Sequence, residues 1–479
     1  MNQYRSDLPK PARLRTEVDA GADATFGAVK TQTNISSFPR SAVIAGVFVL
    51  VFIYVLAASY HIHRVNTEIV KADQGAYISY ARQMVATQYD VVGGRNQMPL
   101  YPAVVSLVAR ADETSAKLFM RAKYLNVALS LVVLFGVFAL VRRTIPAFEA
   151  TTLTLVVAFT VYVYRAGYVQ SELVFYGLFF LSFLLALSLL AKPTFRVAAL
   201  TGAALGVAYL TKASVLPLLA AIVFWGCVGA WVKGTRSAEP SPAIRSGAAV
   251  VLVAVVFLVT VFPYIQTSKE RFGHWFYNVN TTIYMWADSW DEVQRVMTGT
   301  GDREHWPDVD PEILPSPTRY FAEHTTRDIA SRVANGLWTS EFRHLVEKPF
   351  GYGKYLIFYF VVALVVAVRS RERVRELCFA DGRWIQTSFV ASVVLGYMLA
   401  YAFYSPIVRG PRLILALYIP TMFSIFWLLS RKPIAEEPLW TSERHELRLD
   451  HVHIAALAML GIDLVFRLPT VIITSFAGA

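Results

Sequence analysis

The fold is decided by the apolar stretch from Ser41 to Tyr60, SAVIAGVFVLVFIYVLAASY, which holds no charged residue. Twenty helical residues span about 30 Å, the thickness of the hydrocarbon core of a bilayer. No small-residue cleavage site follows, so we expect a retained membrane helix rather than a removed signal peptide. Residues 1–40 are polar and rich in Thr, Ala and Arg, and they are predicted to form a disordered cytosolic tail.

Similar apolar runs recur along all 479 residues, of which 55% are hydrophobic and 16% charged, with a mean hydropathy of +0.45. Soluble domains carry about 25% charged residues, so this much apolar surface requires a surrounding bilayer. The sequence therefore predicts an all-α polytopic membrane protein with about eleven transmembrane helices. The predicted helices begin near Ser41, Leu118, Ala150, Leu173, Val197, Val215, Ser246, Tyr355, Ile385, Leu413 and His453.

The cations of the short loops predict the orientation of these helices. With the tail inside, the basic segments Arg142-Arg143, Lys233–Arg245 and Arg369–Arg383 all fall on the cytosolic side. The net charge of +11 is therefore attributed to loop cations that face anionic membrane lipids, and no nucleic-acid partner is predicted. We expect a multi-pass protein of the bacterial plasma (inner) membrane with a cytosolic N-terminus.

The first outer loop, residues 61–117, lies within an N-terminal transmembrane module predicted over residues 41–266. Apolar and aromatic residues follow Asp73 at helical spacing, which predicts a short interfacial helix with tyrosines at the headgroup level. Pro99 and Pro102 are expected to break the chain before a second interfacial helix over Ala103–Ala109.

The second long outer segment is the loop predicted over residues 267–353, after the seventh helix. It contains five tryptophans among charges and prolines, which is typical of a cap over a substrate more than of a linker. C-terminal transmembrane helices are predicted over residues 354–479. The tryptophans of the loop are Trp275, Trp286, Trp290, Trp306 and Trp338.

Three short motifs resemble the GT-C superfamily of polyprenol-dependent glycosyltransferases. They are Ala72-Asp73-Gln74-Gly75-Ala76-Tyr77 with Ala81-Arg82-Gln83-Met84, then Met98-Pro99-Leu100-Tyr101-Pro102, and Gly206-Val207-Ala208-Tyr209-Leu210-Thr211-Lys212. The third is similar to a run in the branch of protein mannosyltransferases, aminoarabinose transferases and rhizobial galacturonosyl transferases. The resemblance implies a GT-C-like helical bundle. It also implies transfer of a sugar from a polyprenyl-phosphate donor to a lipid, glycan or protein acceptor on the outer face.

The sequence differs from the family pattern just before the proline of the first loop. Aminoarabinose transferases have an acidic and a basic residue there, whereas this chain has Gln97 and Met98. A metal or phosphate contact made by that pair is therefore not carried over. Arg95, just upstream, is the substitute cation.

Asp73 is the candidate catalytic base, because a carboxylate can take the proton of an attacking acceptor hydroxyl. The alternative is that Asp73 only caps the helix that it precedes, a position where Asp is favoured. The phosphate of the donor needs cations, and cations in short outer loops are exceptions to the charge bias of membrane proteins. The alternative for these cations is that they anchor helix ends. The candidate phosphate-binding residues are Arg409, Arg412, Lys212, Arg165 and Arg95.

Glu172 is a candidate for acceptor binding or for helping to hold a divalent metal, although an acidic residue in a first helical turn also matches the helix dipole. No cofactor follows from the sequence, and the two cysteines lack metal-binding spacing. The large loop supplies hydrogen-bonding and stacking groups suited to sugar recognition. Its candidate acceptor-binding residues are His274, Asn278, Asn280, Tyr284 and Trp286.

Two other classes of function are weighed against the inverting glycosyltransferase. A transporter or flippase of a lipid-linked sugar needs charged or broken helices near mid-membrane, whereas the charges here cluster at predicted helix ends. A polyprenyl-diphosphate glycan ligase or polymerase would rely on an outer histidine, for which His274 is the candidate. The Asp308-Val309-Asp310 motif of nucleotide-sugar enzymes is set aside, because nucleotide sugars are absent outside the membrane.

Overall fold

The structure is a computed structural model. Residues 1–39 of the tail predicted over residues 1–40, and the candidate Arg409, lie outside the residues that it describes. The described residues are 40–64, 66–91, 93–110, 112–236, 241–300, 306, 309–310, 312–343, 352–408, 412–442 and 445–467.

Apolar helices make up the body of the molecule, and the prediction of an all-helical multi-pass membrane protein is confirmed. The helices of the body are α1 (Arg40–Arg64), α4 (Ser115–Val141), α5 (Ala147–Val157), α6 (Val163–Arg165), α7 (Glu172–Ala191), α8 (Phe195–Thr211), α9 (Leu216–Arg236), α10 (Ser241–Phe272), α16 (Tyr352–Arg369), α18 (Trp384–Tyr404), α19 (Tyr418–Leu429) and α21 (Leu449–Ile462). A π-helical turn, Ala158–Tyr162, joins α5 to α6 in one span.

Within the described residues, eight helices are long and apolar enough to cross a membrane. A ninth is obtained if α16 and α17 (Arg371–Phe379), which meet at a bend of 103°, count as one span. Two shorter apolar helices, Phe195–Thr211 and Ile414–Leu429, correspond to the remaining predicted runs. Each of the eleven predicted runs therefore coincides with an apolar helix, although two are shorter than a standard span.

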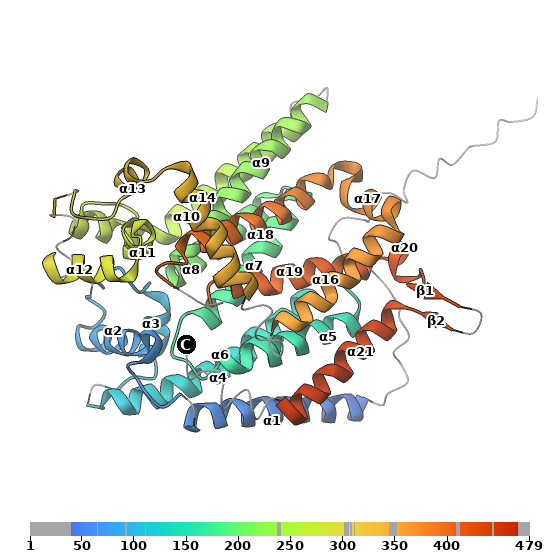
Figure 1. Ribbon diagram of the computed structural model, residues 1–479, viewed down its shortest axis with the longest axis horizontal. Coiled ribbons are helices and arrows are strands. Elements are labelled where there is room, and N and C mark those ends of the chain that lie inside the picture. The colour runs from blue at the N-terminus through green and yellow to red at the C-terminus, as the bar shows by residue number, and fades with distance from the viewer. Residues whose placement is uncertain are drawn as a thin grey trace, which may run out of the picture.

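The helices run between two ends of different character (Figure 1). One end carries α2 (Gln74–Ala86), α3 (Leu100–Ser106) and the described residues between 273 and 343, with α11 (Val279–Thr282), α12 (Trp290–Thr300), α13 (Pro317–Glu323) and α14 (Thr326–Gly336). We call this the loop-rich end, and we call residues 273–343 the cap. The other end carries α17, α20 (Lys432–Ala435) and an exposed antiparallel pair of two-residue strands, β1 (Trp440–Thr441) and β2 (Glu446–Leu447).

Small residues let the helices pack closely. On α8, a Cβ added at Gly202 would lie 2.5 Å from the Val253 carbonyl oxygen, and one added at Gly206 would lie 2.5 Å from the Cβ of Thr260. The two glycines are four residues apart, a spacing that brings membrane helices into close contact. The motif that begins at Gly206 therefore seats α8 on α10 and ends with Lys212 at the loop-rich end.

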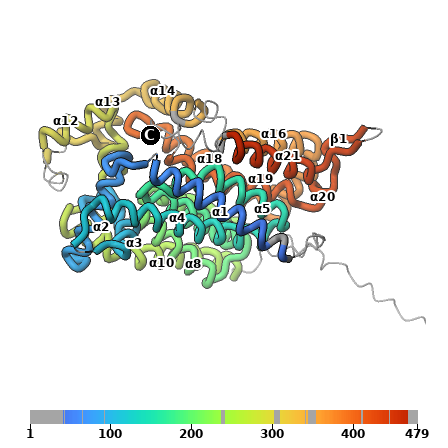
Figure 2. Tube along the Cα trace, turned by 90° about the horizontal axis from the view of Figure 1, so that it is seen from below, coloured from blue at the N-terminus to red at the C-terminus, as the bar shows by residue number. Residues whose placement is uncertain are grey.

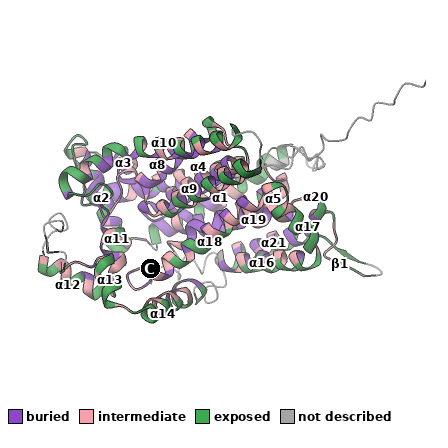
Figure 3. Ribbon diagram, turned by 90° about the horizontal axis from the view of Figure 1, so that it is seen from above, coloured by how far each residue is buried: buried purple, intermediate pink, exposed green. Residues whose placement is uncertain are grey.

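The inner faces of the bundle form the core. Figure 2, seen from below, shows α1 in front of the bundle, where it packs against α4 and α6. Buried positions concentrate between the helices and exposed positions on their outer faces (Figure 3). Many exposed positions on the long helices are large and apolar, for example Phe48, Val132 and Val259. An apolar exterior around a packed interior is the arrangement that a bilayer requires.

Two predictions for the first loop need correction. The tyrosines of α2 do not face lipid headgroups, because Tyr77 and Tyr80 are buried against the protein. The second helix begins at Leu100 rather than Ala103, and it includes Pro102 in its first turn. Proline is tolerated there because the amide that it lacks would have no partner within the helix.

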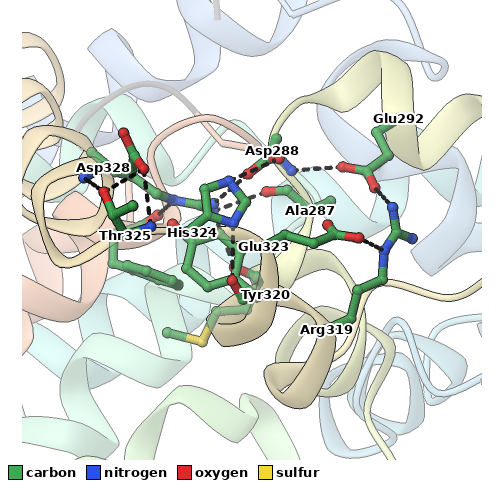
Figure 4. Close-up of polar contacts among 12 residues, drawn as sticks. Ala287, Asp288, Glu292, Arg319, Tyr320, Glu323, His324, Thr325 and Asp328 are labelled. Atoms are coloured by element: carbon green, nitrogen blue, oxygen red, sulfur yellow. Dashed lines mark hydrogen bonds and ion pairs between the residues drawn. The ribbon is translucent and has the colours of Figure 1, made fainter. Parts of the chain in front are cut away.

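The cap is braced against α18. A Cβ added at Gly336 of α14 would lie 2.0 Å from the carbonyl oxygen of Ala402, so the two backbones are in direct contact. The Arg332 guanidinium donates to the carbonyl oxygens of Phe403, Met285 and Ala287. Next to it, Asp288 lies 3.2 Å from the His324 ring nitrogen Nε2 (Figure 4).

Candidate active site at the loop-rich end

A cavity of about 340 Å³ opens at the loop-rich end, within the size range of small-molecule sites. Among the described residues that line it, four carry charge: Asp73, Glu172, Lys212 and Arg412. They come from four separate turns of the chain, after α1, before α7, after α8 and after α18. The bundle therefore brings together groups up to 339 residues apart in sequence.

Asp73 stands in an uncommon backbone conformation. Ala72 and Asp73 are consecutive residues with positive φ, 57° and 65°. The left-handed region costs a non-glycine residue about 1–2 kcal/mol, and Asp tolerates it better than most. Asp73 occupies the N-cap position of α2, yet its side chain makes no capping hydrogen bond. The carboxylate is instead half exposed and directed at Arg412.

A buried amide network holds this strained turn. The Gln74 side chain accepts from the Val169 backbone amide at 2.9 Å and from the Asn66 side chain at 2.7 Å, and it donates to the Lys71 carbonyl at 3.1 Å. Gln170 donates to the Ala72 carbonyl at 2.5 Å. Buried amides are costly to leave unpaired, so these hydrogen bonds stabilise the turn that presents Asp73.

The four charged side chains form two ion pairs. Lys212 Nζ lies 2.7 Å from Glu172 Oε1, and both side chains are largely buried. Arg412 Nη1 lies 3.0 Å from Asp73 Oδ2 in a more exposed position. Arg412 Nε is 3.9 Å from Glu172 Oε1, which links the two pairs. Tyr176, one turn along α7 from Glu172, donates to the Arg412 carbonyl and fixes its backbone there.

The surroundings shift the pKa of both cations. Burial lowers the pKa of the Lys212 ammonium, and the Glu172 carboxylate offsets part of that effect. For Arg412, burial also acts to lower the pKa, but the carboxylates of Glu172 and Asp73 outweigh it and raise the pKa above its usual range. Arg412 is therefore a permanent cation at the mouth of the site.

Two other candidate cations lie outside the cavity lining. Arg95, itself at a positive φ of 58°, is buried and donates to Thr267 Oγ1 at 2.6 Å and to the Tyr264 carbonyl at 3.2 Å. Its guanidinium stacks 3.8 Å from the centre of the Tyr264 ring. Arg165, in the last turn of α6, is also outside the lining. The structure thus places Arg95 as a joint between the first loop and α10.

The acceptor candidates of the cap divide in the same way. Asn278, Asn280 and Tyr284 line the cavity. Asn278 caps α11 by accepting from two backbone amides, and Asn280 accepts from the Tyr404 hydroxyl at 3.1 Å. Trp286 packs instead against Phe403, Tyr320 and Phe321, and His274 is exposed outside the lining.

Sequence reasoning missed several lining residues. Tyr397, Tyr401 and Tyr404 project from successive turns of α18 into the cavity. Their spacing of four and three residues is a helical stripe that could have been noticed, but it lies within an apolar span where tyrosines also serve as packing. Asn66 and Gln74, which hold Asp73 in place, gave no signal because lone amides follow no periodic pattern.

The donor set of the cavity does not fit a metal ion. Within the described part of the chain, no group of three or more His, Cys, Asp or Glu side chains is placed to hold one. Asp73 and Glu172 each face Arg412, and Glu172 also faces Lys212. These cations would repel a divalent ion at the same carboxylates, so no chemical step is assigned to a metal.

No family model and no curated protein matches the chain. Among solved structures, the chain is similar to the crystal structure of ArnT from Cupriavidus metallidurans bound to undecaprenyl phosphate. The sequence identity is 14% and the TM-score is 0.34, over 82% of this chain and 77% of that chain. A similarity this distant says nothing about individual residues of the cavity, whose chemistry follows from their own geometry.

Proposed function

We propose that this multi-pass membrane protein is an inverting glycosyltransferase of the GT-C type. It transfers a sugar from a polyprenyl-phosphate donor to an acceptor at the outer face of the membrane. The observation that carries the proposal is the contact of 3.0 Å between Asp73 and Arg412, beside Lys212, in a cavity at the ends of the membrane helices. A base and phosphate-binding cations are the groups that such a transfer needs.

In the proposed reaction, an acceptor hydroxyl attacks the anomeric carbon of the donor sugar. The bond between that carbon and the phosphate oxygen breaks, and its electron pair leaves with the phosphate. Asp73 accepts the proton of the hydroxyl, while Lys212 and Arg412 stabilise the charge on the leaving phosphate. The prenyl chain would remain in the bilayer and help to position the anomeric carbon.

The positions of the charges support an enzyme over a transporter. Glu172 is the first residue of α7, and Lys212 directly follows α8, so both lie at helix ends. A carrier would place such groups near the middle of the membrane. The exposed position of His274, outside the cavity lining, gives no support to a ligase that relies on that histidine.

The proposal is tested by Asp73→Asn in the purified full-length protein, supplied with lipid-phosphate-linked sugars and candidate acceptors. We expect sugar transfer to fall at least about 100-fold, the contribution typical of a general base, while thermal unfolding stays unchanged. Glu68→Gln is the matched control, because Glu68 is exposed on the same loop and, within the described residues, forms its ion pair with Lys71. Full transfer by the Asp73 variant would rule out its role as the base.

A further inference from the structure

The charges of the cavity are balanced before any substrate binds. Two cations, Lys212 and Arg412, face two carboxylates, Glu172 and Asp73, and each cation already touches a carboxylate. A phosphate that enters the cavity therefore meets no uncommitted cation among the described lining residues. It can bind only by taking a cation from a carboxylate, or by sharing one.

The two ion pairs differ in how easily they can be opened. The Glu172 side chain is 4% exposed and that of Lys212 is 20% exposed, whereas the values are 50% for Asp73 and 27% for Arg412. A carboxylate that loses its partner in a buried place cannot regain water, so opening the Glu172 pair is costly. Asp73 already borders solvent and can be hydrated when its partner leaves.

The geometry of Arg412 also suits a shared role. Its Nη1 serves Asp73, and its Nε lies 3.9 Å from Glu172 without a hydrogen-bond partner in the described structure. Its backbone is fixed by Tyr176, so the guanidinium can turn without moving the loop. A planar guanidinium can bind a phosphate through two N–H groups at once. The contact of Arg412 with Asp73 uses only one nitrogen, so the contact with phosphate would be the stronger one.

We propose that Asp73 and the donor phosphate compete for Arg412, so that donor binding itself releases Asp73 to act as a base. This inference rests on the proposed function and adds an order of events to it. Without donor, Asp73 is held in an ion pair; with donor, Arg412 turns to the phosphate and the carboxylate faces the acceptor. Because such coupling is reciprocal, the Asp73 carboxylate must weaken phosphate binding by the same factor.

The experiment measures binding of geranylgeranyl phosphate, a prenyl phosphate without a sugar, to the full-length protein in detergent by calorimetry. We expect Asp73→Asn to bind this probe more tightly, by up to about fivefold, the factor that an exposed ion pair is worth. Asparagine keeps the shape of the side chain and tolerates the left-handed backbone, and thermal unfolding verifies that each variant is folded.

A double-mutant cycle separates competition for Arg412 from a general loss of negative charge. In an Arg412→Gln background, where the probe binds more weakly, Asp73→Asn should no longer tighten binding. Tightening of equal size in both backgrounds, or no tightening in the wild-type background, overturns the competition. A wild-type protein that does not bind the probe at all would instead contradict the proposed function, so the two failures are distinguishable.

Discussion

Asp73 occupies the position of a helix N-cap without playing the usual role of a capping residue. It stands at the start of a helix, where Asp normally accepts hydrogen bonds from the first backbone amides. Here its backbone is left-handed and its carboxylate turns to Arg412 instead. Strained conformations of this kind persist where the surroundings enforce them, often at functional sites, and the Asn66–Gln74 network provides that enforcement.

A second carboxylate has a different environment. Glu341, in the π-helical segment Leu337–Phe342, is 8% exposed, and neither of its oxygens has a hydrogen-bond partner in the described structure. Burial raises the pKa of this carboxyl to about 8. The folded protein therefore holds the proton more tightly than the unfolded chain does, whose carboxyl has a pKa near 4.3.

This pKa predicts how stability depends on pH. The stabilising contribution of protonated Glu341 is complete below about pH 4 and is lost as the pH rises to about 8. Glu341→Gln, which cannot ionise, should lack this loss. The melting temperature of the variant should therefore rise relative to that of the wild type as the pH increases from 5 to 8. Glu376→Gln, on the exposed face of α17, is the control. Parallel melting curves for Glu341→Gln and wild type across this range would contradict the prediction.

The sequence predicted the chemical types in the site better than their partners. Asp73, Lys212, Arg412 and Glu172 were named from motifs and loop positions, and the structure brings all four into one cavity. Arg95 was named as a substitute for the basic residue that the family pattern has before the proline of the first loop, but its placement depends on stacking against Tyr264. Tertiary packing decides which cation of a loop points into the cavity, and a single sequence does not contain that information.

At the level of elements, α14 determines where the cap sits. Arg332 reaches from this helix to the end of α18 and to residues 285–287, and its side chain is only 7% exposed. Met285 lines the cavity, and Phe403 immediately precedes Tyr404, which also lines it. One side chain thus connects two walls of the cavity.

Arg332→Ala should release the cap from α18. Three carbonyls would lose their donor, at about 1–3 kcal/mol each where water does not replace it. We expect faster cleavage of residues 273–343 by chymotrypsin and weaker acceptor use, with the membrane helices intact. Arg327→Ala removes an exposed arginine from the same helix and should leave the cleavage rate unchanged. Equal rates for the two variants would show that Arg332 does not hold the cap.

Elements were predicted more accurately in type than in detail. All eleven apolar runs became helices because hydrophobic length alone specifies them in a bilayer. The burial of Tyr77 was missed, since tyrosine suits both a headgroup layer and a protein interior with a hydroxyl partner. That partner, Ser171 at 3.0 Å, lies 94 residues away in sequence.

At the scale of the whole molecule, the proposed reaction requires the loop-rich end to face outward. Asp112 is exposed at that end and Glu376 is exposed at the opposite end. In protein with Cys227 and Cys378 replaced by Ser, a membrane-impermeant maleimide added to intact cells should label Asp112→Cys. Glu376→Cys should react only after lysis. The reverse pattern would place the cavity in the cytosol and contradict the proposed reaction.

The hydrogen bonds around Asp73 also determine when, during synthesis of the chain, its turn can fold. Asn66, Gln74 and Ala72 bond to residues 95 to 101 positions later, in the turn between α6 and α7. A ribosome that has just released Asp73 has therefore made the residue but not its surroundings. The turn at Asp73 cannot form these hydrogen bonds until the third span has been inserted into the bilayer and residues Gly167 to Gln170 have been synthesised. A nascent chain arrested before that point would carry the whole first motif without the conformation that gives it a use.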